Sequence, residues 1–169
     1  MVDEMEIAGI PVPNAGPFFL AVLAVHVAAG LASVFCGAGA ALSRKGAARH
    51  RCFGRLYLWC LGVMFASMAV MSAIRWSHNA HLFAIGVLAA ALALTGHLNR
   101  RRRQPYLHIA GMGGSYIVLL TGFYVDNGRH LPGWDRLPAW AWWIAPSLVG
   151  LPVIAHSIRR RLSTGRSAS

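Results

Sequence analysis

The sequence predicts an all-α fold, a polytopic transmembrane helical bundle with five spans in a single integral membrane domain, residues 1–169. The first observation is composition: 56% of the residues are hydrophobic, only 12% are charged, and the mean hydropathy is +0.50. An ordinary soluble domain carries about twice that share of charge. The second is that the apolar residues gather in runs close to the length of about 20 residues that a helix needs to cross a bilayer core. The third is that the basic residues cluster between these runs.

We expect the spans at about residues 17–42, 56–74, 82–98, 106–125 and 140–158. The segment before the first span is acidic where a secretory signal is basic, so the first span is expected to direct insertion and to remain in the mature protein. The second span follows a basic segment, and the third is the shortest. The fourth is followed by DNGRHLPGWDRLP, whose prolines and glycines predict a turn-rich cap. The fifth contains Pro152, which lacks an amide proton and is expected to bend the helix.

The distribution of charge predicts the orientation of the bundle. Of the 16 basic residues, 13 lie between spans one and two, between spans three and four, or after span five. The other three basic residues and all five acidic residues lie on the opposite side. Because cytoplasmic loops are enriched in lysine and arginine, we expect the amino terminus outside and the carboxyl terminus inside. A formal charge of +11 that is divided among short clusters does not predict a nucleic-acid-binding face.

Few sequence motifs indicate chemistry. The chain has no paired carboxylates for acid–base work and none of the HExxH, GxSxG or glycine-rich phosphate motifs. We therefore assign no catalytic residue and leave enzymatic activity open. Cys36, Cys52 and Cys60 have neither CxxC nor zinc-site spacing, which indicates small apolar side chains and predicts no metal site.

The string HRCFGRLYLW, residues 50–59, places Arg51 and Arg55 at the cytoplasmic end of the second span. No aspartate or glutamate lies on that side of the predicted membrane. The partners of both guanidinium groups are therefore expected to be lipid phosphates, carbonyl groups at helix carboxyl ends, or an anionic ligand. One interpretation is retention by anionic headgroups, with Gly54 permitting the chain to bend. The other is a preformed site for a phosphate, a lipid headgroup or a haem propionate.

The same string carries a family resemblance. HRCFGRLY follows a first span that contains a histidine, and it precedes HIAGMGGSYIVLLTGFYVD and an outer loop rich in tryptophan and proline. In this arrangement, from about residue 26 to residue 156, the chain resembles a family of small bacterial membrane proteins that is known only as a domain of unknown function. The resemblance implies a multi-pass protein of the bacterial cytoplasmic (inner) membrane and implies no activity. It also implies importance for His50, Arg51, Gly54, Arg55 and Tyr57.

The predicted spans contain no aspartate, glutamate or lysine. Four histidines lie inside these spans or at their ends, namely His26, His97, His108 and His156. An imidazole in the membrane needs a partner or a role. One interpretation is helix packing, in which each imidazole is hydrogen-bonded to a neighbouring helix. In the first span, His26, Gly30 and Ser33 share one helical stripe, and small residues there let another helix approach.

The second interpretation is a haem b site. His97 and His108 both lie near the inner boundary, on helices joined by a short loop, so their imidazoles can face each other and hold an iron between them. On this interpretation the candidate cofactor-binding residues are His97, His108, His26, His50, Arg51 and Arg55.

The sequence leaves two functions open. The first is an integral membrane protein that acts as a lipid- or partner-binding helical bundle. It contacts the lipid bilayer, and it meets a partner subunit or a second copy through its small-residue stripes. The alternative is a membrane redox protein that binds haem b, with His97 and His108 as axial ligands.

Overall fold

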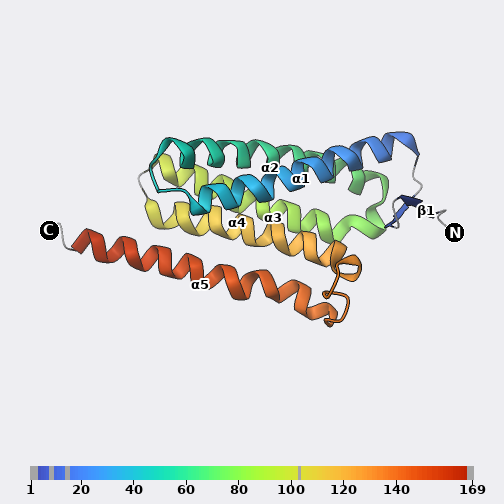
Figure 1. Cartoon of the computed structure of the whole chain (residues 1–169). Coiled ribbons are helices and arrows are strands. Elements are labelled where there is room, and N and C mark those ends of the chain that lie inside the picture. Colours follow the sequence, from blue (N-terminus) through green and yellow to red (C-terminus); the bar gives the residue numbers. More distant parts are fainter. Residues whose placement is uncertain (1–3, 8–9, 14–15, 103, 167–169) are drawn as a thin grey trace. The chain divides into compact units, whose positions relative to one another are not determined.

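The computed structural model describes residues 4–7, 10–13, 16–102 and 104–166 (Figure 1). Five long helices dominate it: α1 (Pro17–Leu42), α2 (Ala48–Ile74), α3 (Trp76–Arg101), α4 (Pro105–Asn127) and α5 (Ala139–Arg166). Each of the five is long and apolar enough to cross a membrane. The predicted all-α fold with five spans is confirmed, and the chain is a multi-pass membrane protein in contact with the lipid bilayer. Its orientation in the membrane stays a prediction.

The helices extend beyond the apolar runs that predicted them. α1 has the predicted bounds, whereas α2 begins about two turns before residue 56 and α5 continues about two turns past residue 158. The difference arises because hydropathy detects only the part of a helix that lies in hydrocarbon, while the helix itself can continue into the polar region. The HRCFGR string therefore lies on the first two turns of α2. Gly54 is an ordinary helical residue there, and the chain does not bend at it.

The segment before α1, for which the sequence predicted no element, forms a two-stranded antiparallel hairpin. Its strands are β1 (Glu4–Ile7) and β2 (Ile10–Pro13), and the register pairs Glu4 with Pro13 and Ile7 with Ile10. Strands of four residues carry too short an alternation to be recognised from sequence alone.

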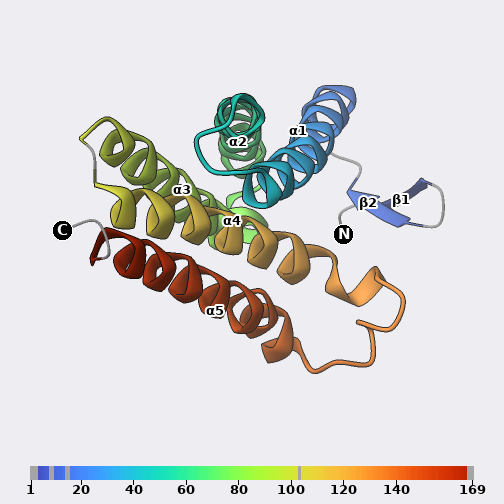
Figure 2. The same cartoon turned by 60° about the vertical axis from the view of Figure 1, so that its left-hand side comes forward.

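The chain divides into two compact units, residues 1–83 and residues 84–169, with the boundary inside α3. In the first unit, α1 and α2 lie side by side and run antiparallel (Figures 1 and 2). At one contact between them, a side chain at Gly39 would meet the ring of Phe53 at 3.0 Å. Farther along the same pair, Gly30 faces the sulfur of Met64. The predicted small-residue stripe of the first span therefore packs against α2.

In the second unit, α4 is packed against α3 on one side and against α5 on the other. A side chain at Gly111 would lie 2.6 Å from the amide nitrogen of Gly96, so the backbones of α3 and α4 are in direct contact. Between α4 and α5, Gly150 receives the side chain of Ile117. Figure 2 shows α4 and α5 side by side along most of their length. Glycine thus sets the close approach in both helix pairs.

The connections between helices are short and hydrogen-bonded. A single residue, Arg75, joins α2 to α3, and its amide and the Asn79 side chain both donate to the carbonyl of Met71. Between α4 and α5, the 3₁₀ helix η1 (Gly128–His130) and a series of turns form the cap that the sequence predicted. The indole of Trp142 closes this cap by donating to the carbonyl of Trp134 at 3.2 Å.

Candidate functional site

Three of the predicted site histidines form a hydrogen bond to the backbone of a neighbouring helix, in each case through Nδ1. His26 Nδ1 donates to the carbonyl of Met64 at 3.1 Å, and His108 Nδ1 donates to the carbonyl of Gly96 at 2.8 Å. His50 Nδ1 donates to the carbonyl of Ala40 at 2.9 Å. Because a carbonyl oxygen only accepts, each of these imidazoles carries a proton on Nδ1. Each bond joins two helices that are consecutive in the chain.

The contact of His26 includes a second polar side chain. Its Nδ1 also lies 3.0 Å from Ser67 Oγ, and the Ser67 hydroxyl itself donates to the carbonyl of Met64 at 2.8 Å. Ser67 is buried, with 7% of its surface exposed. A polar triad therefore joins the first half of α1 to the second half of α2, within apolar segments where unsatisfied polar groups would be costly in lipid.

His97 and His108 lie where α3 and α4 touch backbone to backbone. His108 donates to the residue that precedes His97, and the contact of Gly96 with Gly111 lies beside both histidines. A haem held between two axial imidazoles needs the width of both rings and of the porphyrin between the helices. The backbone contact fills that space. Within the described part of the chain, no cluster of three or more histidine, cysteine or acidic side chains suits a metal ion.

Basic side chains at the junction of α1 and α2 bind the carboxyl end of α1. Lys45 Nζ donates to the carbonyl of Ala41 at 2.9 Å, and His50 donates to Ala40 in the same turn. Partial burial lowers the pKa of the Lys45 ammonium below its ordinary value. Arg51 Nη1 donates to the carbonyl of Gly46 in the connecting turn. For these three side chains, carbonyl groups at or just beyond a helix carboxyl end are the partners.

Arg55, like the nearby Arg44 and Arg49, makes no hydrogen bond or ion pair with any residue that the structure describes, but unlike those two it lies beside Arg51 in a depression of the surface. It lies one turn after Arg51 on the same face of α2, and both side chains are exposed. Ala48, Cys52 and Leu56 complete the lining of a shallow depression of about 400 Å³ around the two guanidinium groups.

The amino end of α2 adds positive potential to this depression. The first turn contains no acidic residue, and Ala47, at the capping position, supplies no side-chain acceptor for the first amide groups of the helix. The exposed amide groups of a helix amino end carry about half a positive charge. The two arginines and the helix end together can bind an anion at this depression, which is termed the Arg51–Arg55 depression below.

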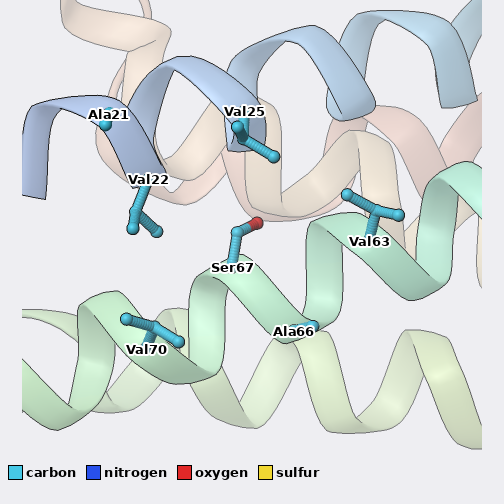
Figure 3. A pocket seen from close by; sticks show the side chains of 7 residues that line it. All are labelled: Ala21, Val22, Val25, Val63, Ala66, Ser67 and Val70. Carbon is cyan, nitrogen blue, oxygen red and sulfur yellow. The ribbon is translucent and has the colours of Figure 1, made fainter. Parts of the chain in front are cut away.

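A second hollow lies between α1 and α2, deeper along the same helices. Figure 3 shows that Val22 and Val25 of α1 point toward α2, and that Val63, Ser67 and Val70 of α2 point toward α1. The hollow has a volume of about 400 Å³ and is termed the α1–α2 groove below; Ala21 and Ala66 complete its lining. The sequence alone does not predict this hollow, because the register of two helices decides which apolar residues face each other.

The six predicted site residues are thus distributed over separate places. His50, Arg51 and Arg55 lie on the first two turns of α2, whereas His26 contacts α2 at residues 64 and 67, about three turns farther along. His97 and His108 belong to the second unit. Ligand binding by any of the six stays a prediction.

Comparison of the chain with protein-family models, with curated proteins and with solved structures finds no match. The resemblance of the HRCFGRLY string to a bacterial membrane-protein family therefore stays a prediction, and the function must be inferred from the geometry.

Proposed function

We propose that this protein is a lipid-binding helical bundle that binds an anionic phosphate group in the Arg51–Arg55 depression. The ligand that we expect there is the phosphate of a lipid headgroup. The observation that carries the proposal is the exposed Arg55 side chain, which has no partner among the described residues and lies beside Arg51 at the amino end of α2. The neighbouring Lys45 and His50 are engaged with the end of α1. Of the two arginines that line the depression, Arg55 is consequently the one more available to an external anion.

Charge and location support a lipid phosphate as the ligand. All five acidic residues lie far from this junction in the sequence, in residues 3–6, at Asp126 and at Asp135. If the amino terminus is outside, as the distribution of basic residues predicts, the depression faces the cytoplasmic leaflet, whose anionic lipids attract basic residues near the membrane surface. A guanidinium group can donate two parallel hydrogen bonds to a phosphate, which an ammonium group cannot do.

Two other functions have less support. The haem b hypothesis has one favourable feature, because an imidazole that donates through Nδ1 to a carbonyl, as His108 does, presents Nε2 to a metal. The contact of Gly96 with Gly111 counts against it, since the macrocycle would need the space between these helices. Binding of a partner subunit through the small-residue stripes is weakened by a similar fact: Gly30 and Gly96 already face neighbouring helices of the same chain.

The experiment compares Arg55→Lys with Arg49→Lys, an exposed arginine of the same helix that does not line the depression. We expect Arg55→Lys to lower the affinity for phosphatidylglycerol about threefold to tenfold, because lysine keeps the charge but loses the paired hydrogen bonds. Arg49→Lys should bind like the wild type. The measurement is a native mass spectrometry titration of the delipidated protein, with thermal melting in the same detergent. Equal affinities of the two variants would leave nonspecific retention by headgroups as the sufficient explanation.

A further inference from the structure

We propose that the Arg51–Arg55 depression and the α1–α2 groove are the two ends of one binding site, which holds a single anionic diacyl phospholipid. The inference rests on the proposed function and adds the class of ligand: a lipid with acyl chains, as opposed to a free phosphate compound. The phosphate lies at the two arginines, and one acyl chain follows α2 into the groove.

The first support is a continuous exposed surface along α2. Arg51, Arg55, Trp59 and Val63 follow one another at intervals of four residues, and each is exposed. Residues four apart are neighbours on a helix surface, so these four side chains form one line that winds gradually around α2. The surface passes directly from the depression, which contains Arg51 and Arg55, to the groove, which begins at Val63.

The order of side chains along this surface matches the order of groups in a phospholipid. Two cationic side chains come first, then Trp59, which is 71% exposed, and then valine and alanine. Tryptophan is typical of the membrane interface, where its ring reaches both the headgroup region and the hydrocarbon. Gly62 lies beside Trp59, and a side chain there would meet nothing within 4 Å, so the surface at this point is open to a chain.

The distances along the helix also fit. From Arg55 to Val63 the rise is about 12 Å, and from Arg55 to Val70 it is about 22 Å, at 1.5 Å per residue. One leaflet of the hydrocarbon core is about 15 Å thick. An acyl chain whose phosphate is bound at Arg55 therefore reaches the near end of the groove at Val63 before the bilayer midplane, and it reaches Ala66, about 16 Å along the helix, at about the midplane.

The chemistry of the groove favours an acyl chain over a polar partner. Six of its seven lining residues are valine or alanine, and the seventh is Ser67. The Ser67 hydroxyl donates to the carbonyl of Met64 and lies in hydrogen-bond contact with His26. The groove thus offers an occupant van der Waals contacts, while the charge that selects the occupant lies at the Arg51–Arg55 depression.

The test uses the full chain, delipidated in detergent, and native mass spectrometry with three probes. Phosphatidylglycerol carries the charge and the chains, phosphatidylcholine with the same chains lacks the net charge, and glycerol phosphate lacks the chains. The variant is Ala66→Phe, which fills the groove, and its matched control is Ala24→Phe, an exposed alanine of α1 that does not line the groove.

We expect the wild type to bind phosphatidylglycerol about tenfold more tightly than phosphatidylcholine, since charge-assisted hydrogen bonds select the headgroup. Ala66→Phe should weaken phosphatidylglycerol binding at least about threefold and leave glycerol phosphate binding unchanged, and Ala24→Phe should change neither. If melting shows that Ala66→Phe is misfolded, Val63→Ala replaces it. This variant removes contacts without adding volume and should lower the same affinity.

The outcomes separate this inference from the proposed function. If Ala66→Phe and Val63→Ala bind phosphatidylglycerol like the wild type while Arg55→Lys binds it more weakly, the headgroup site stands and the acyl-chain groove is refuted. If Arg55→Lys has no effect on either charged probe, the headgroup site itself is refuted.

Discussion

The contact between Gly96 and Gly111 yields the sharpest prediction about stability. A Cβ atom at Gly111 would lie 2.6 Å from the amide nitrogen of Gly96 and 2.7 Å from the carbonyl oxygen of Leu92. Both neighbours are backbone atoms that cannot rotate away. Ordinary contacts begin at 3.4 Å, so Gly111→Ala must separate α3 and α4 locally by about 0.8 Å.

The separation has two costs. Overpacking of this kind destabilises a protein by about 1–3 kcal/mol. The hydrogen bond from His108 to the carbonyl of Gly96, now 2.8 Å long, would stretch beyond useful length, and such interhelical bonds contribute about 0.6 kcal/mol in membranes. Relative to a helical glycine-to-alanine change at an open position, which gains the same helix propensity, we therefore expect Gly111→Ala to destabilise the protein by about 2–4 kcal/mol.

The assay is unfolding of the purified protein in a titration of sodium dodecyl sulfate, followed by circular dichroism. The matched control is Gly62→Ala, a helical glycine where a Cβ atom would meet nothing within 4 Å. Because alanine favours the helix more than glycine does, this control should be neutral or more stable by up to about 1 kcal/mol. The reasoning is refuted if the two variants unfold at the same detergent fraction.

Three further predictions test other parts of the molecule. His26→Leu removes the bonds to Met64 and Ser67 and should destabilise the protein by about 1 kcal/mol in the same unfolding assay, whereas His156→Leu, at an exposed imidazole, should not; equal losses would contradict the role of His26. Protein purified after haem-sufficient expression should show no Soret band, and a band that disappears in both His97→Ala and His108→Ala would establish the haem site instead. A reporter that is active only after export should be inactive when fused after Ser169, and activity would reverse the predicted orientation.

Much of the fold is predictable from the sequence, because insertion into a membrane depends on local composition. The bounds of α1 agree with the apolar run at residues 17–42, and the turn-rich cap after α4 agrees with its prolines and glycines. The predictions fail for polar segments, because hydropathy does not indicate whether such a segment is a helix, a strand or a loop. The polar first turns of α2 are helical, so Arg51 and Arg55 share a helix face; the hairpin of β1 and β2 was missed entirely.

The candidate site is less predictable. The sequence alone identified Arg51 and Arg55 as basic residues without nearby acidic partners, and it left three kinds of partner open. Both side chains are exposed, but Arg51 donates to the carbonyl of Gly46 and Arg55 has no hydrogen-bond partner among the described residues, a distinction that depends on the turn between α1 and α2. Likewise, the sequence left two interpretations of His26 open, helix packing and a cofactor site, and the partners Met64 and Ser67 follow from the register of two helices.

The sequence by itself determined the five spans, the division of basic residues between them and the scarcity of ionisable groups inside them. These properties depend on the transfer of about 20 consecutive residues into lipid, which is a sum over neighbours in the chain. The tertiary structure alone decided that Gly96 meets Gly111 and that valines of α1 and α2 line one shallow, open groove. Such contacts join residues far apart in the chain, and they depend on how two surfaces of side chains interlock, which no local property of either helix contains.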